Sequence, residues 1–165
     1  MRKGWVFDSS PLVVLGKIKA LELIALLPGR IVVPKAVAEE LAAGPASDPA
    51  RLWIRSRGCP GRKVSVQVAS LVAGWDIGAG EAAVITYARA HAGHTAILDD
   101  RLARTCATSL RVPMMGTIGL LLWMKRRSMI GAVRPYLDRM AATDFRLDEN
   151  LILEALRLAG EGGER

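Results

Sequence analysis

Short apolar stretches that alternate with helical patterns constrain the fold of this chain more than any other feature. The strand-like stretches lie at residues 5–7, 31–33, 64–68, 95–98 and 112–115. Helical patterns lie at residues 11–18, 20–27, 35–43, 51–56, 81–92, 101–110, 117–127, 132–142 and 149–159. Strands that alternate with helices form a parallel sheet flanked by helices, so the sequence predicts an α/β fold.

Size and composition narrow the class of protein. We expect residues 1–165 to form one domain, with C-terminal helices at about 132–159 packed on it. The chain is 51% apolar, which is enough for a sizeable core, and its two cysteines cannot make a disulfide framework. The longest uncharged apolar stretch, 112–124, is shorter than the roughly 20 residues that span a bilayer. The N-terminus lacks a signal-peptide pattern, so we expect a cytoplasmic protein with reduced thiols.

Acidic residues directly follow two of the expected strands. Asp8 comes after the stretch at 5–7, and Asp99 and Asp100 come after the stretch at 95–98. Binding sites of open α/β sheets lie at the C-terminal ends of the strands, so these carboxylates are candidates for a site. The alternative interpretation is structural, because Asp is also a favourable N-cap for the helix that follows each strand.

Two glutamates lie where they can join these aspartates. If Val37 and Leu41 mark the buried stripe of the helix at 35–43, Glu40 lies roughly 80° from its centre and Glu39 lies opposite. Glu40 therefore borders the core, although a pairing with a surface base is an equal alternative. Glu81 begins its helix after a glycine-rich turn, where an acid also complements the helix dipole.

A cluster of Asp8, Glu40, Glu81 and Asp100 would need a divalent cation to offset its repulsion. Oxygen ligands alone indicate Mg²⁺ or Mn²⁺. Such a pocket suits metal-assisted hydrolysis of a phosphodiester. A phosphoacceptor site of the receiver type fits less well, because the last strand ends in Gly116 and Thr117 rather than in lysine.

The distribution of basic residues favours a nucleic-acid substrate. The chain has 23 bases against 16 acids, and the segments 49–75 and 101–137 contain five and seven bases but no acid. Phosphate contacts dominate affinity for nucleic acids, so such basic flanks suit a nuclease. The candidate contacts are Arg55, Arg57, Arg101, Arg104, Lys125 and Arg126. Alternatively, the bases at 125–127 complement the dipole at the end of their helix.

His91 and His94 have a simpler interpretation. They flank Gly93 at the end of the expected helix 81–92, a position that favours helix capping over catalysis.

Several motifs occur in an order that resembles a known family. They are Asp8-Ser9-Ser10-Pro11-Leu12, Val33-Pro34, Val37-Ala38-Glu39-Glu40-Leu41, Gly78-Ala79-Gly80-Glu81-Ala82, Leu98-Asp99-Asp100 and Gly116-Thr117. In this order and spacing, across about residues 4–159, the chain resembles PIN-domain proteins. It is most similar to the VapC-like ribonuclease toxins. One branch of these toxins begins with the motif that this chain has at residues 8–12. The same branch has the sequence found here at residues 116–121, followed by a basic stretch.

The resemblance implies a three-layer α/β/α fold with a five-stranded parallel sheet. It implies a Mg²⁺- or Mn²⁺-dependent endoribonuclease, the toxin of a toxin–antitoxin pair, with RNA, a small antitoxin and a second copy of the chain as partners. It assigns catalysis to Asp8, Glu40, Glu81 and Asp100. It assigns metal binding to Asp8, Glu81 and Asp100, with Asp99 as a further metal ligand ranked below Asp100. Ser10 and Thr117 would orient a carboxylate or a water. The alternative is a catalytically inactive PIN-like module that binds RNA or protein.

Overall fold

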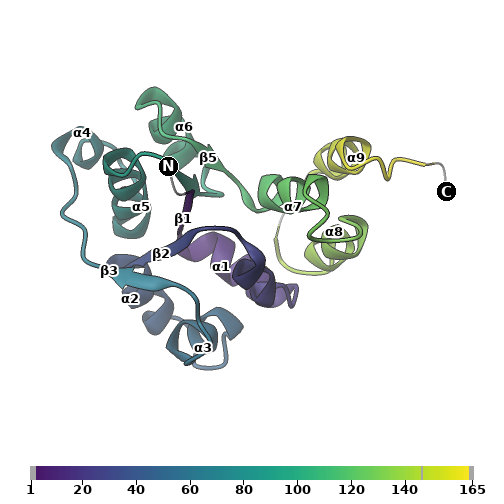
Figure 1. Ribbon diagram of the computed structural model, residues 1–165, viewed down its shortest axis with the longest axis horizontal. Helices are drawn as coiled ribbons and strands as arrows, with labels where there is room; N and C mark the ends of the chain where they lie inside the picture. Colours follow the sequence, from purple (N-terminus) through teal and green to yellow (C-terminus); the bar gives the residue numbers. More distant parts are fainter. Residues whose placement is uncertain (1–2, 146, 164–165) are drawn as a thin grey trace.

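A five-stranded sheet forms the centre of the molecule (Figure 1), a computed structural model that describes residues 3–145 and 147–163. The strands are β1 (Gly4–Phe7), β2 (Arg30–Pro34), β3 (Arg62–Val64), β4 (His94–Ile97) and β5 (Met114–Met115). Their order across the sheet is β3-β2-β1-β4-β5, and every neighbouring pair is parallel. The first strand of the chain therefore lies in the middle of the sheet.

Helices cover both faces of this sheet. They are α1 (Ser9–Lys17), α2 (Lys35–Ala43), α3 (Pro49–Arg55), α4 (Ser70–Ala73), α5 (Ala79–Ala90), α6 (Arg101–Ser109), α7 (Thr117–Arg126), α8 (Arg134–Ala141), α9 (Glu149–Leu158) and the 3₁₀ helix η1 (Leu21–Leu26). Helix α5 lies against β1, β2 and β4 on one face. On the other face, the Trp5 ring meets the Trp123 ring of α7 edge to face, with centroids 4.7 Å apart. The predicted three-layer α/β/α architecture is confirmed.

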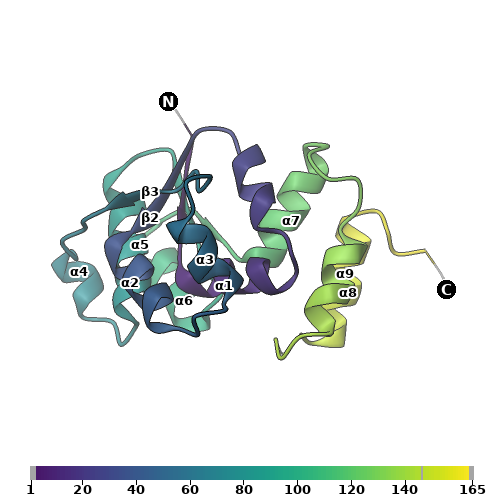
Figure 2. The same ribbon diagram turned by 90° about the horizontal axis from the view of Figure 1, so that it is seen from below.

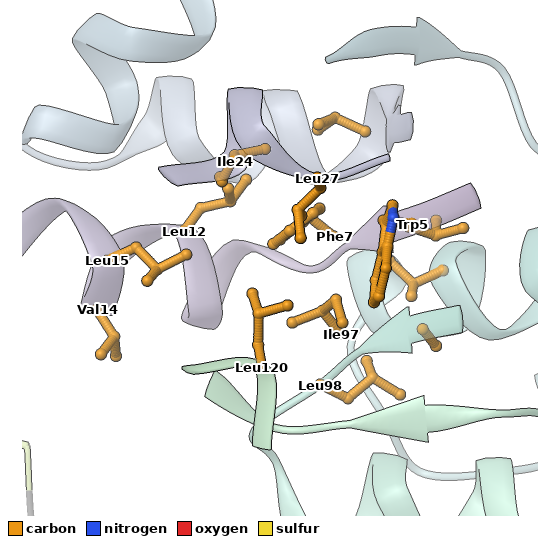
Figure 3. Packing of buried hydrophobic residues seen from close by; sticks show 14 of the residues in the cluster. Trp5, Phe7, Leu12, Val14, Leu15, Ile24, Leu27, Ile97, Leu98 and Leu120 are labelled. Carbon is orange, nitrogen blue, oxygen red and sulfur yellow. The ribbon is translucent and has the colours of Figure 1, made fainter. Parts of the chain in front are cut away.

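The core on the α1 and α7 face is built around the odd-numbered residues of β1 (Figure 3). Trp5 and Phe7 point to this face, where Leu12 and Leu15 of α1 and Leu120 of α7 meet them. Fully burying such a side chain contributes roughly 1.5–3 kcal/mol. The burial of β1 on both faces fixes where the strand ends and therefore where the residue after it lies.

The edge strand β3 is shorter than the sequence predicts. The alternation of valines over 64–68 predicts a strand, but the ladder with β2 runs only from Arg62 to Val64. Strand β2 ends at Pro34, and α2 begins at the next residue, so β2 offers no backbone partner beyond that point. Val66 and Val68 are half-buried and pack against the core without a strand partner.

Two other elements differ from the expected pattern. The stretch at 20–27 forms the 3₁₀ helix η1 rather than an α-helix, and the four-residue helix α4 has no counterpart in the prediction. Both are too short for an apolar period to define them. Among the described residues, no helix has the length and apolarity that crossing a bilayer requires.

The C-terminal helices α8 and α9 lie beyond α7, at the end of the molecule away from α2 and α5 (Figure 2). Glu161, just past α9, connects the three helices. Its two carboxylate oxygens accept the backbone N–H groups of Val133 and Arg134 at 2.7 and 2.9 Å, and its carboxylate lies 3.5 Å from Lys125 Nζ. Burial alone would raise the pKa of Glu161, but these hydrogen bonds and the Lys125 charge lower it overall.

We predict that Glu161→Ala lowers the free energy of unfolding by about 1–2 kcal/mol, because the start of α8 loses its cap. Amide hydrogen exchange should become faster in α8 before it changes in β1. A suitable control is Glu154→Ala, which removes only an exposed pairing with Arg157. Equal effects of the two variants in a urea titration would refute the capping role of Glu161.

Candidate active site

Asp8 is the buried carboxylate of the candidate site. It directly follows β1, its side chain is only 1% exposed, and Oδ1 has no hydrogen-bond partner in the described part of the chain. Burial raises the pKa of Asp8 to about 7; the backbone N–H groups of Ser9 and Ser10 oppose this effect, while the charges of Glu81 and Glu40 add to it. The end of the central strand therefore carries a carboxyl group whose charge nothing in the described structure neutralises.

Glu40 reaches this strand end from α2. Its Oε2 accepts the Ser9 hydroxyl at 2.7 Å, and its Oε1 accepts the Gly80 amide at 2.8 Å. A Cβ at Gly80 would lie 2.6 Å from Glu40 Oε2, so only glycine leaves room for this contact. Glu39 and Glu40 are both exposed, but the contacts of Glu40 and its charge interactions with Asp8 and Glu81 turn it toward the other acids, as the helix phase predicts.

Glu81 and Asp100 come from the first turns of α5 and α6. Glu81 Oε2 accepts the Gly78 amide at 2.6 Å, and Asp100 Oδ1 accepts the Ala103 amide at 2.8 Å. Burial, followed by the charges of Asp100 and Glu40, raises the pKa of Glu81. Both carboxylates are helix caps, as the structural interpretation expects, yet they also lie within electrostatic reach of the other acids.

Asp99 has a different environment from Asp100. Its Oδ1 accepts the Thr117 amide at 2.7 Å, and its Oδ2 accepts the Thr117 hydroxyl at 2.6 Å. Thr117 is fully buried at the start of α7. Asp99 therefore joins the end of β4 to α7, and Thr117 orients this carboxylate.

The hydroxyl beside the first aspartate belongs to a different serine from the one that the motif indicates. Ser9 binds Glu40, whereas Ser10 is exposed and offers Asp8 its backbone N–H. The resemblance points to Ser10, whereas the local sequence alone does not rank the two adjacent serines. The two serine side chains point about 100° apart around α1. Which of them faces Glu40 therefore depends on the angle at which α1 leaves β1.

The side chains of the acidic cluster are of the type that binds a divalent cation, but in this structure they are not arranged as a metal site. Within 3–145 and 147–163, no three Asp, Glu, His or Cys side chains are placed to hold a metal ion. Glu40 and Glu81 turn oxygens toward glycine amides, which takes them away from a common centre. The donors are nevertheless all carboxylates, and Asp8 Oδ1 is buried and unpartnered. Hard cations such as Mg²⁺ and Mn²⁺ prefer this donor type.

The candidate RNA-contacting bases divide into two groups. Arg55, Arg57 and Arg101 are exposed, and no carboxylate of the described residues lies within 4 Å of them or of Arg104. Lys125 instead pairs with Glu161 and donates to the Gly131 carbonyl. The side chain of Arg126 donates to the Leu122 carbonyl at 3.5 Å.

Lys125 and Arg126 thus take the structural role at the end of α7 that the helix-dipole interpretation gives them. Arg104 lines a cavity of about 480 Å³ together with Asp99, Met114, Met115 and Phe145 among others.

Comparison with known proteins identifies one family. A family model described as a PIN domain matches residues 4–161, a segment that contains every acid of the candidate site. No curated protein and no solved structure matches the chain.

We predict that Asp8→Asn stabilises the metal-free protein above neutral pH. The pKa of Asp8 rises from its ordinary 3.8 to about 7 on folding, so its proton is bound more tightly in the folded state. Stability from this group is complete below pH 4 and is lost as the pH rises to about 7. The full loss is at most about 4 kcal/mol. Urea titrations in EDTA should show a much larger gain in stability for the variant at pH 8 than at pH 4.5.

A divalent cation should reverse this difference. Mn²⁺ at pH 8 should stabilise the unmodified protein and leave Asp8→Asn nearly unchanged, since binding to the folded state raises stability by mass action. Asp76→Asn, at an exposed loop position, is the matched control and should behave like the unmodified protein. An equal pH response of Asp8→Asn and the unmodified protein would show that Asp8 is not the titrating group.

Proposed function

The chain belongs to the PIN-domain family, and on that premise we propose that it is a Mg²⁺- or Mn²⁺-dependent endoribonuclease, the toxin of a toxin–antitoxin pair. PIN domains are generally nucleases that depend on divalent metal ions. One observation carries the proposal: Asp8 is buried with an unpartnered oxygen at the point where Glu40, Glu81 and Asp100 approach from three other elements. Helix capping accounts for Glu81 and Asp100 one at a time, but not for their approach to a buried, unpartnered Asp8.

The proposed roles of the acidic residues follow from their positions and hydrogen bonds. Asp8, Glu81 and Asp100 would hold the cation, which when bound supplies the positive charge that phosphodiester cleavage requires. Glu40 is oriented by the Ser9 hydroxyl and the Gly80 amide. We assign to Glu40 the acceptance of a proton from the water that attacks phosphorus in line. Asp99 would act indirectly, by holding the start of α7 through Thr117.

The substrate would bind through bases near the acidic site and beyond it. Arg101 and Arg104 follow Asp100 on α6, and Arg104 lines a cavity together with Asp99. Arg55 and Arg57 at the end of α3 add positive charge without neighbouring acids. Phosphate contacts of this kind position RNA, and contacts to unpaired bases give sequence specificity.

The proposal includes a protein partner, an antitoxin or a second copy of the chain. Protein interfaces need exposed apolar surface. Helix α9 offers Leu151, Leu153 and Leu158, each about half exposed or more.

A catalytically inactive module that binds RNA or protein is the second candidate. The observation that favours it is the orientation of Glu40 and Glu81 toward glycine amides, since the described carboxylates do not form a preassembled metal site. The two candidates differ in whether a metal ion produces strand scission.

We predict that the purified protein cuts a mixed pool of structured RNAs in Mn²⁺ or Mg²⁺ and not in EDTA. Asp8→Asn should lower the cleavage rate at least a hundredfold while its circular dichroism stays unchanged. Glu40→Gln and Glu39→Gln form a matched pair on α2, because only Glu40 faces the other acids. Loss of activity in Glu40→Gln alone supports the site, whereas equal activity in both variants would remove Glu40 from the mechanism.

If metal-containing reactions give no cleavage and RNA binding persists, the binding module becomes the better description. Binding of Mn²⁺ to the unmodified protein should then be measured directly, with Asp8→Asn beside it.

A second prediction concerns the bases. Replacing Arg55 and Arg57 by glutamine should reduce the slope of log affinity against log salt by about 1.4, or about 0.7 for each lost phosphate contact with single-stranded RNA. Lys125→Gln is the control, since Lys125 pairs with Glu161, and its slope should match the unmodified protein. Fluorescence anisotropy with a catalytically dead variant measures these slopes, and an unchanged slope in the double variant would exclude contact at α3.

A further inference from the structure

The cavity that Arg104 lines, of about 480 Å³, lies at the same edge of the sheet as the acidic site. Strands β4 and β5 end in register, and the residues that follow them form part of its wall. Asp99 is among these residues and directly precedes Asp100, so the cavity begins about 3.8 Å along the backbone from the acidic site. Most of the lining is apolar and includes Met114, Met115, Ile118, Leu122, Phe145 and Leu151.

Two polar side chains of the cavity meet over Gly116, the residue that joins β5 to α7. A Cβ at Gly116 would lie 2.9 Å from Asp99 Oδ1 and 3.7 Å from Arg104 Nη1. Both groups therefore border the space that the missing side chain leaves. Among the described residues, no ion pair within 4 Å joins Arg104 to Asp99. A donor and an acceptor thus line one gap without satisfying each other.

Asp99 keeps hydrogen-bonding capacity after it binds Thr117. Its Oδ1 accepts the Thr117 amide at 2.7 Å, and its Oδ2 accepts the Thr117 hydroxyl at 2.6 Å. An ionised carboxylate has about four lone-pair sites, so roughly half of this capacity remains. The two bonds to Thr117 also fix the orientation of the carboxylate, which places its free acceptors before any ligand arrives.

Arg104 is an exposed donor whose side chain makes no hydrogen bond or ion pair within 3–145 and 147–163. Only its backbone carbonyl is used, as the acceptor of the Thr108 hydroxyl at 2.9 Å. A guanidinium carries its N–H donors in a rigid planar fork. Such a fork matches a ligand that presents two acceptors side by side.

The apolar walls suit a flat ring. Met114 and Met115 are half-buried, and methionine adapts its shape and contacts aromatic rings favourably through sulfur. A cavity of several hundred Å³ with an apolar lining and a few polar groups is typical of small-ligand sites. On the premise of the proposed nuclease function, the substrate is RNA, and its unpaired bases have apolar faces with polar edges.

The order of donors and acceptors distinguishes the four bases. Guanine presents N7 and O6 as adjacent acceptors, which fit the two arms of an arginine fork. Its N1–H and N2–H donors follow on the next edge, where a carboxylate can accept them. Adenine has an amino donor beside N7, cytosine has an amino donor in place of O6, and uracil has a single acceptor there. Only guanine therefore matches the fork of Arg104 and the acceptor of Asp99 together.

We propose that this cavity binds an unpaired guanine of the RNA substrate. Its N7 and O6 accept from the Arg104 guanidinium, and its N1–H or N2–H donates to Asp99 Oδ1. The guanine belongs to a nucleotide beside the bond that is cut, because Asp99 adjoins Asp100. The inference rests on the proposed nuclease function, and it makes Arg104 a residue that determines sequence specificity.

The test compares oligouridine pentamers that carry one guanine or one adenine at the centre. Their binding to the full chain is measured by fluorescence anisotropy in EDTA at constant ionic strength, where no cleavage occurs. We expect the guanine pentamer to bind at least tenfold more tightly, which lies within the discrimination of a good bidentate contact. Equal affinities of the two pentamers would overturn the proposal.

Arg104→Gln and Arg101→Gln form a matched pair on α6, since both residues are exposed and only Arg104 lines the cavity. Arg104→Gln should bring the two pentamers within about twofold of each other. Arg101→Gln should weaken both and leave their ratio unchanged, because a phosphate contact carries no sequence information. A ratio that survives in Arg104→Gln would show that Arg104 contacts only the backbone, and would overturn the proposal.

A nucleotide titration separates this inference from the nuclease function. In EDTA, guanosine 5′-monophosphate should shift the methyl resonances of Met114 and Met115, and adenosine 5′-monophosphate should shift them less at the same concentration. These shifts in a protein that cuts no RNA would support the cavity and refute the nuclease. Unmoved methyl resonances in a protein that does cut RNA would overturn the cavity proposal and leave the nuclease in place.

Discussion

The burial of β1 between two helical layers is the constraint on which the candidate site depends. Because β1 is the central strand and its side chains are buried on both faces, the residue that follows it has little freedom of position. That residue is Asp8, whose carboxyl group is therefore almost completely buried. An apolar strand thus imposes an electrostatic cost at its end, visible in the raised pKa of Asp8.

Helix N-termini offset part of this cost. Asp8 and Asp100 are the N-caps of α1 and α6, and Glu81 lies in the first turn of α5. The partial positive charge at a helix start stabilises a nearby carboxylate by about 0.3–1 kcal/mol. This is less than the repulsion and burial at the site require, since the pKa values of Asp8 and Glu81 stay raised. Capping and metal binding are therefore compatible uses of the same side chains, which is why the sequence alone did not separate them.

The sequence predicted the features that follow from periodicity and chain order, and failed where tertiary geometry decides. Helix phase separated Glu40 from Glu39, and strand ends located Asp8 and Asp100, because both arguments use only local repeats. The choice between Ser9 and Ser10 depends on how α1 leaves β1, and the pairing of Lys125 with Glu161 joins residues far apart in the chain. Strand β3 is short because its partner β2 ends at Pro34. The alternation of valines in the sequence contains no information about where that partner ends.

The same strand also organises the charge of the molecule. Gly4 at its start leaves space for the His94 ring beside Arg30, while Asp8 at its end joins the acids, so β1 separates a basic edge of the sheet from an acidic one. His91 and His94 were expected to act as caps, and His94 does use Nδ1 on a backbone carbonyl at the helix end. Capping consumes one ring nitrogen only. The other, Nε2, is buried against Gly4 without a partner among the described residues, and a buried polar atom without a partner costs about 1–3 kcal/mol.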